Sequence, residues 1–207
     1  MYTSLRLDVP FYEQAPMECG PSSLQMVLEF LGERHDKESI KSLVESDSTG
    51  NTWSIGLAKA AGELGFKTEF YSKKLGFNAE HFSLDYYQKL TDGAAATQLK
   101  SEHLHKRCKE LGVTTIEGTF TLAELLSRIS IDCTAIGLFD WNRIDGCEGY
   151  KGHFMPIVGY EDGAVLVHQP GPSDPTPYLP LPQEVFELAR KAPGTDEDLI
   201  FIHRKGK

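Results

Sequence analysis

The chain carries few basic residues for its size. Lysine and arginine together number 21 against 30 acidic residues, which gives a formal net charge of −9 at pH 7. The basic residues form no stripe along the sequence. Because nucleic acids are bound mainly by cationic side chains that neutralise phosphates, this charge argues against a nucleic-acid partner. Basic or neutral substrates suit such a surface better than acidic ones.

Cysteine is also sparse, with four in 207 residues. The four are widely spaced, no Cys-x-x-Cys pair occurs and no cysteine–histidine cluster has zinc-ligand spacing, so the pattern favours neither a disulfide framework nor a metal site. No apolar run approaches membrane-spanning length, and residues 1–10 lack the apolar segment of a secretion signal. We therefore expect a cytoplasmic protein with free thiols, without a membrane partner, a metal or a cofactor. Its oligomeric state is left open.

Apolar periodicity divides the chain into a helical first part and a strand-rich last third. A length of 207 residues with 40% hydrophobic residues suits one domain spanning residues 1–207. Helices are expected at about 20–31, after Asp36, at 54–64, over most of 79–111, from 122 to 129 behind a capping box at Thr121, and at 183–191. Strands are expected at 67–73, 134–140, 153–160, 164–168 and 198–204, with a stiff proline-rich loop at 170–182. Helices first and antiparallel strands later predict an α+β fold.

The helix expected at 20–31 begins beside Cys19, within the run ECGPSSL. Leu24, Val27, Leu28 and Leu31 share one face of this helix, and the polar segment before it favours a thiol that faces a loop. The N-terminus of a helix carries partial positive charge and spare N–H groups, which stabilise an anion. Since the thiolate is the reactive form of cysteine, the sequence predicts a nucleophile at Cys19.

His153 begins a strongly apolar strand, and it is the candidate base for this thiol. A third group should orient the imidazole through its other nitrogen, and three residues at strand ends qualify: Gln169, Asp140 and Asn142. Gln14, five residues before Cys19, has an amide suited to an oxyanion hole together with the Cys19 backbone N–H.

Two parts of the chain resemble one family. Val9–Gln14 reads VPFYEQ and Glu18–Leu28 reads ECGPSSLQMVL, while Gly152–Tyr160 reads GHFMPIVGY and Val167–Gly171 reads VHQPG. These segments resemble the cysteine helix and the histidine strand of papain-like cysteine peptidases of the bacteriocin-leader-processing, or double-glycine, type. The order along the chain is that of the family. Residues 67–130 carry no matching motif.

The resemblance implies a papain-like fold in which the cysteine helix packs on a C-terminal antiparallel sheet, with the site between them. It implies peptide or small amide hydrolysis through an acyl-enzyme, with Cys19 and His153 as catalytic residues. We further expect Gly20, Gly152 and Asn142 to contact the substrate. Two departures stand out: Gln169 replaces the usual aspartate, so Asp140 remains an alternative, and Gln14 precedes the cysteine by five residues where the family commonly has six.

Other functions use the same residues. The thiol and histidine suit acyl transfer to an amine, and the glutamine in place of aspartate suits a peptide-binding module that has lost catalysis. Metal binding by the cysteines and the seven histidines is disfavoured by their spacing. The aromatic segments around Phe77 and Tyr86-Tyr87 are expected to belong to the core more than to a substrate cleft.

Overall fold

The structure, a computed structural model, describes residues 4–206. In this range the helices are α1 (Cys19–Phe30), α2 (Lys37–Val44), α3 (Ser54–Glu63), the 3-10 helix η1 (Ala79–Ser83), α4 (Asp85–Lys89), α5 (Ala94–Glu110), α6 (Leu122–Arg128), α7 (Trp141–Asp145) and α8 (Gln183–Arg190). The strands are β1 (Leu5–Arg6), β2 (Lys67–Ser72), β3 (Thr114–Glu117), β4 (Cys133–Asp140), β5 (Gly152–Glu161), β6 (Ala164–Gln169), β7 (Thr176–Pro182) and β8 (Leu199–His203).

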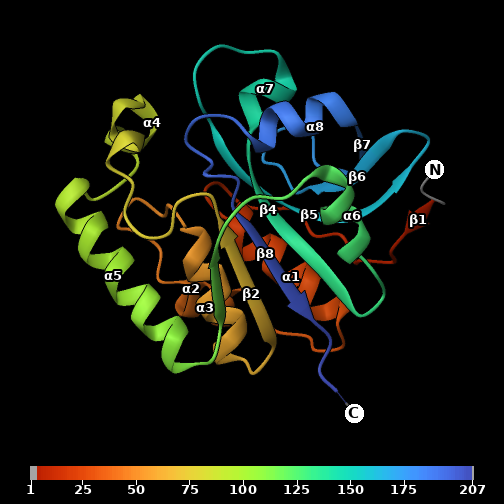
Figure 1. The fold of residues 1–207 in the computed structure, drawn as a ribbon, viewed down its shortest axis with the longest axis horizontal. Helices are drawn as coiled ribbons and strands as arrows, with labels where there is room; N and C mark the ends of the chain where they lie inside the picture. The colour runs from red at the N-terminus through yellow and green to blue at the C-terminus, as the bar shows by residue number, and fades with distance from the viewer. Residues whose placement is uncertain (1–3, 207) are drawn as a thin grey trace.

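The strands form one sheet in the order β3-β2-β8-β4-β5-β6-β7, with β1 paired to β5. All neighbours run antiparallel except β2 and β3, which are parallel. Helices α1 and α3 contact the sheet through β4, β5, β2 and β8, whereas α8 contacts β4, β6 and β7. In Figure 1, α2, α3 and α5 lie together at one side of the sheet, and α7 and α8 lie at the other. The expected α+β fold is confirmed.

The central strands are apolar on both faces because helices cover both. In β4, Ile136 and Leu138 belong to the hydrophobic cluster shared with α1, α2, α3 and α5, while Ala135 and Phe139 belong to the cluster shared with α6 and α8. This alternation follows the two-residue period of a strand. A strand buried in this way is a rigid support for any side chain at its end.

Helix α1 forms as its periodicity predicts. Leu24, Val27 and Leu28 are fully buried against the sheet, and the Ser23 hydroxyl donates to the Phe154 carbonyl of β5 at 3.1 Å. The helix begins at Cys19, one residue earlier than expected. The Glu18 side chain does not cap it, and its carboxylate binds Lys41 of α2 at 2.8 Å. The first turn of α1 is thereby fixed to both β5 and α2.

The expectation of a loop over residues 170–182 is partly wrong. Thr176–Pro182 forms β7, which pairs antiparallel with β6. Proline lacks an N–H, so proline-rich segments form strands at sheet edges, where one side of the strand needs no partner. β7 lies at such an edge. β1 and β3 were not expected either, because two and four residues carry too little pattern.

Candidate active site

Cys19 and His153 lie on neighbouring elements of the fold. Cys19 is the first residue of α1 and is half-buried, and His153 is the second residue of β5 and is 5% exposed. Both line the same cavity, which has a volume of about 440 Å³. The hydrogen bond from Ser23 in α1 to Phe154 in β5 holds the two elements together next to this pair.

Gln169, at the end of β6, holds the His153 ring. The ring Nε2 lies 3.0 Å from the Gln169 side-chain oxygen. That oxygen also accepts from the Gly171 N–H at 2.6 Å, and the Gln169 amide nitrogen donates to the Ser173 carbonyl at 2.6 Å. These partners fix which end of the amide faces His153. Since an amide oxygen only accepts, the histidine must carry its proton on Nε2, which leaves Nδ1 as a free base.

Burial sets the charge state of both groups. It lowers the pKa of His153 to about 4, against the smaller effect of the Gln169 hydrogen bond, which raises it. Burial likewise raises the pKa of the Cys19 thiol, although the N–H groups of Phe154, Gly20 and Cys19 lower it. A helix terminus contributes about 0.3–1 kcal/mol, less than one pKa unit, whereas full burial shifts a pKa by about 3–5 units. Burial therefore opposes the effect of the helix terminus at Cys19, and we expect the pair at neutral pH to be thiol and neutral imidazole.

Gln14 lines the same cavity as Cys19. Its backbone N–H donates to the Pro170 carbonyl at 2.8 Å, which joins the segment before α1 to the turn after β6. Its side-chain oxygen is buried and has no hydrogen-bond partner. A side-chain amide with an unsatisfied atom at the cavity wall is available to a ligand.

The other expected site residues have different surroundings. Asp140 accepts from the N–H groups of Asn142 at 3.2 Å and Lys151 at 3.0 Å, and so it caps α7 and bonds to the segment before β5. The Asn142 amide donates to the Glu148 carbonyl at 2.7 Å. Gly20 is packed against α3 and its leading loop, where an added Cβ would lie 3.0 Å from Thr52. Of the three expected substrate contacts, only Gly152 lines the cavity.

Aromatic residues expected in the core also line the cavity. Phe77, Tyr86 and Tyr87 contribute to its wall, and the Tyr86 hydroxyl donates to the Gly152 carbonyl at 3.3 Å. Tyr87 is buried as well, and its hydroxyl donates to the Gly194 carbonyl at 2.6 Å. The core expectation thus holds for Tyr87, whereas Phe77 and Tyr86 are only partly buried and form part of the cavity wall.

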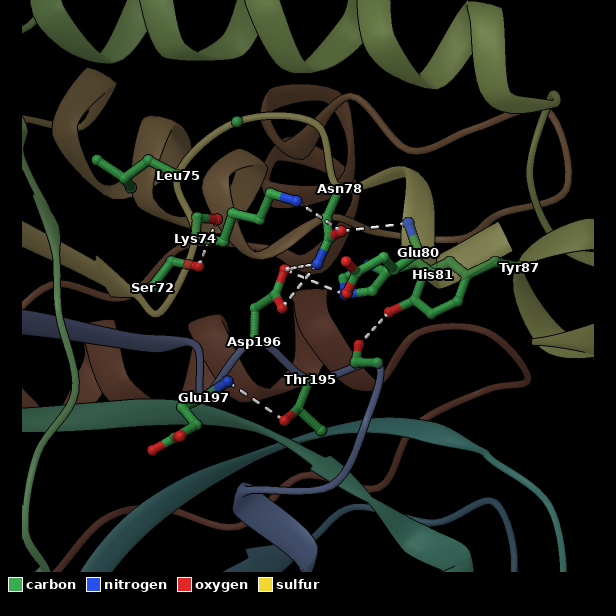
Figure 2. Close-up of polar contacts among 12 residues, drawn as sticks. Ser72, Lys74, Leu75, Asn78, Glu80, His81, Tyr87, Thr195, Asp196 and Glu197 are labelled. Carbon is green, nitrogen blue, oxygen red and sulfur yellow. Dashed lines mark hydrogen bonds and ion pairs between the residues drawn. The ribbon is translucent and has the colours of Figure 1, made fainter. Parts of the chain in front are cut away.

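The far end of the cavity contains residues that sequence reasoning missed. Asp196 and Asp198, just before β8, both line the cavity, and Asp196 meets Asn78 and His81 from the segment around η1 (Figure 2). The Asn78 amide donates to both Asp196 oxygens, at 3.0 and 3.1 Å, and His81 Nε2 lies 3.0 Å from the Asp196 carboxylate. Burial raises the pKa of Asp198 to about 7, and the neighbouring Asp196 acts in the same direction. No local pattern connects residues 118 positions apart.

Residues 4–206 lack a metal-binding cluster and a membrane-spanning helix. No group of three or more histidine, cysteine, aspartate or glutamate side chains is placed to hold a metal ion. In the same part of the chain, no helix has both the length and the apolar character needed to cross a membrane.

The sequence comparisons and the structure comparisons identify similar proteins that carry different functional names. The sequence profile of a family described as guanylylate cyclase matches residues 9–202. A relative from Arabidopsis thaliana named guanylyl cyclase 1 is 24% identical over 219 residues, covering 97% of this chain and 77% of the relative.

The similar solved structures are peptidase domains. A C39-like peptidase from Bacillus anthracis has a TM-score of 0.63 at 14% identity, covering the whole of both chains. A double-glycine motif protease from an AMS/PCAT transporter, in complex with its leader peptide, has a TM-score of 0.52 at 15% identity and covers 98% of this chain and 99% of its own. The peptidase domain of Streptococcus ComA has a TM-score of 0.52 at 15% identity, with 95% and 98% covered. The expected resemblance to double-glycine peptidases is confirmed at the level of the fold.

Proposed function

The chain belongs to the guanylylate cyclase family, and we propose that it uses Cys19 to hydrolyse a peptide or related amide bond. One observation carries the proposal: Gln169 accepts from His153 Nε2 while the same ring lines the cavity that Cys19 enters. A third group thus orients the imidazole, and the imidazole and the candidate nucleophile line one cavity, which supports nucleophilic catalysis. The fold shared with peptidase domains supports the same chemistry.

The reaction begins with both groups neutral. His153 Nδ1 takes the thiol proton as the Cys19 sulfur bonds to the substrate carbonyl carbon, and the carbonyl oxygen becomes negative. The imidazolium then gives that proton to the departing amine as the C–N bond breaks, which leaves a thioester on Cys19. His153 next takes a proton from water, whose oxygen attacks the thioester, and the acid product leaves as the proton returns to sulfur.

Gln14 and the Cys19 backbone N–H are the proposed donors to the carbonyl oxygen. Cys19 is at the N-terminus of α1, where N–H groups have no partner within the helix. Gln14 lines the same cavity, and its side-chain NH2 is the group that would donate; the atom without a partner is the amide oxygen, which only accepts. Donors of this kind typically contribute about 2.7–4 kcal/mol each to the stability of the transition state.

Gln169 is proposed as the orienting residue, and Asp140 is left out because its carboxylate is engaged by α7 and by the Lys151 N–H. A neutral amide fixes the tautomer of His153 but does not stabilise the imidazolium by charge. The imidazolium is therefore formed only during attack and departure, consistent with the lowered pKa of His153.

The test uses a peptide mixture of broad composition and detection of new peptide ends by mass spectrometry. The wild-type protein and Cys147→Ser, which changes an exposed cysteine, should generate the same products, and Cys19→Ala should generate none. An acyl-enzyme is expected as a mass increase on the peptide that contains Cys19. Cleavage that survives in Cys19→Ala would sink the proposal.

The same peptide mixture distinguishes hydrolysis from acyl transfer and from peptide binding without catalysis. Products joined to an added amine would indicate acyl transfer in place of hydrolysis. Peptide binding that is equal in wild type and Cys19→Ala, without turnover in either, would indicate a binding module.

A second candidate is cyclisation of GTP, which is favoured by the whole-chain similarity to a relative named guanylyl cyclase 1. The cavity charges do not select this substrate, because Asp196 and Asp198 line the cavity together with Lys74 and Lys151. The protein incubated with GTP and Mg²⁺ or Mn²⁺ should yield no cyclic GMP by mass spectrometry. Cyclic GMP above the level of a heat-inactivated sample would instead support this second function.

A further inference from the structure

Unsatisfied polar atoms gather on the wall of the cavity. In residues 4–206, five buried side-chain atoms have no hydrogen-bond partner, and four of them belong to cavity-lining residues: Gln14, His81, Thr97 and Asp198. Of these four, His81 Nε2 faces the Asp196 carboxylate at 3.0 Å, so the atoms of Gln14, Thr97 and Asp198 are the ones without any partner. Buried polar atoms are nearly always paired in folded proteins, so such a concentration marks a place where a ligand supplies the partners. Gln14 belongs to the proposed active site, and Thr97 and Asp198 have no role there.

The atoms of Thr97 and Asp198 lie in the far part of the cavity wall, on α5 and the segment before β8. Thr97, in the first turn of α5, is 5% exposed and its hydroxyl is unpaired. Asp198 is held rigidly, because its carbonyl accepts from the Leu138 N–H of β4 at 3.2 Å. Its Oδ1 is buried and unpaired. The carboxyl group is hydrogen-bonded to Ser54 and Ser72, which lower its pKa against the effect of burial. When Asp198 is ionised, its unpaired Oδ1 only accepts, so the missing partner is then a donor.

The charges around Asp198 leave it without a cationic partner of its own. Lys74 also lines the cavity, but its ammonium donates to the Asn78 side-chain oxygen at 3.2 Å. His81 faces Asp196 at 3.0 Å. In Figure 2 the Asp196 carboxylate points towards Asn78 and His81, whereas Glu197 beside it points the other way. Two carboxylates thus share one end of the cavity.

Aromatic rings form the wall between this end and the proposed active site. His81 stacks on Tyr87 with ring centroids 4.9 Å apart, and Trp53 stacks on the same Tyr87 at 5.8 Å. Tyr86 contacts Tyr87 at 5.4 Å and reaches the Gly152 carbonyl next to His153. Because His81, Trp53 and Tyr150 stack on Tyr87, its ring faces are covered, and the wall offers a ligand apolar packing between the two ends of the cavity.

We propose that this acidic end, formed by Asp196 and Asp198 with Thr97 and the Tyr87 wall, binds a cationic group of the substrate, either an ammonium or a guanidinium. The inference rests on the proposed function, because it assigns the cationic group to the molecule that Cys19 cleaves. Two sources share this chemistry: a basic side chain and a free N-terminal amine. Ionised Asp198 is favoured when the cation is bound, which offsets the effect of burial on its pKa.

The test measures binding in Cys19→Ala protein, so it does not depend on turnover. Three probes are titrated by NMR: Nα-acetyl-lysine amide with a cationic side chain, norleucine amide with a cationic α-amine, and Nα-acetyl-norleucine amide with no cation. We expect one of the two cationic probes to bind about tenfold or more tightly than the neutral probe. The preferred cationic probe identifies the source, and equal affinities for all three would overturn the inference.

Substitutions at Asp198 and Asp196 test whether the preference for a cationic probe depends on these two residues. Asp198→Asn, made in Cys19→Ala protein, should abolish the preference for the cationic probe and leave the affinity of the neutral probe unchanged. Asp196→Asn serves as a second variant, since asparagine tolerates the positive φ of 46° at that position. The matched control is Glu80→Gln, which removes one negative charge from an exposed residue outside the cavity wall. A preference that survives both aspartate variants, or that Glu80→Gln abolishes equally, would contradict the inference.

Failure of the proposed function gives a different result. If no peptide is cleaved, the titration still reports whether the cationic probes are preferred and whether that preference depends on Asp198. If cleavage occurs without a cationic preference, the proposed function stands and this inference fails.

Discussion

At Cys19 two physical effects act on one thiol. The N-terminus of α1 favours the thiolate, and burial favours the neutral thiol and raises its pKa. His153 responds to the same cavity in the opposite sense, because burial lowers the pKa of a base to about 4. The residue-scale conclusion is a pair that is neutral at rest and that separates charge only when a substrate carbonyl is present.

The alkylation of Cys19 by iodoacetamide should therefore follow the titration of a thiol with a raised pKa. We expect the rate to be low at pH 7 and still rising above pH 9, measured by mass spectrometry of the Cys19 peptide. The exposed Cys147 is the internal control within the same samples. The pH dependence of the two alkylation rates is compared, and not their absolute values, because a difference in solvent access changes the rate by the same factor at every pH. Rapid alkylation of Cys19 that persists below pH 7 would contradict the neutral pair.

Gln169 is the second residue whose role is open to test. Gln169→Ala should lower kcat/KM on an accepted substrate by about 10²-fold, since the imidazole loses its orientation. It should also reduce stability by about 1–3 kcal/mol, because the buried Nε2–H of His153 loses its acceptor.

Gln169→Glu provides the matched comparison. A carboxylate beside His153 raises the pKa of the ring, so the acidic limb of the kcat/KM profile should move to higher pH. An unchanged acidic limb would mean that residue 169 does not act through the imidazole.

At the scale of elements, the site depends on how closely α3 approaches α2. Trp53, Ser54 and Ile55, at the start of α3, line the cavity. The first turn of α3 packs closely on the end of α2 at Gly56. A Cβ added to Gly56 would lie 2.5 Å from the Val44 carbonyl oxygen. The small side chain at this position is thus a packing requirement that also positions part of the cavity wall.

Gly56→Ala should destabilise the protein although alanine is the better helix former. The gain in helix propensity is about 1 kcal/mol, whereas forcing a methyl group against a backbone carbonyl costs about 1–3 kcal/mol. Urea unfolding should therefore show a net loss of stability. Gly118→Ala is the control, because nothing lies within 4 Å of a Cβ added there. Equal stability of the two variants would show that α3 shifts away from α2 freely.

At the scale of the whole molecule, the cavity is assembled from segments that are far apart in the sequence. The segment before α1, the start of α3, the loop and short helices from 74 to 87, the start of β5 and the segment before β8 each provide part of its wall. A net charge of −9 gives the molecule an overall preference for cations, and Asp196 and Asp198 place two of those charges inside the cavity. Acidic residues are spread along the whole sequence, and folding places two of them, Asp196 and Asp198, together in the cavity wall.

The stability of the molecule should depend on pH through Asp198. Its pKa is raised to about 7 from an ordinary value of 3.8, so the folded state keeps a proton that the unfolded chain releases. This contribution is full below pH 4 and is lost as the pH rises through 7. Asp198→Asn removes it, and the variant should therefore gain about 4 kcal/mol relative to wild type between pH 4 and pH 8. Urea unfolding at several pH values measures the difference, in which the titration of His153 cancels. A difference independent of pH would mean that Asp198 is ionised throughout.

The sequence by itself determined the elements that carry the site. The apolar face of Leu24, Val27 and Leu28 predicted α1, the capping box at Thr121 began α6, and the alternation in β4 and β5 located His153 at a strand end. These signals are local, since helix caps and the periods of helices and strands depend on residues within a few positions of one another.

The tertiary structure alone decided the rest. It selected Gln169 over Asp140 as the partner of His153, formed β7 from a segment that resembled a loop, and brought Asp196 to Asn78. Burial, pKa and the shape of a cavity depend on segments that are distant in the chain, and neither the identity of a residue nor its near neighbours contains that information.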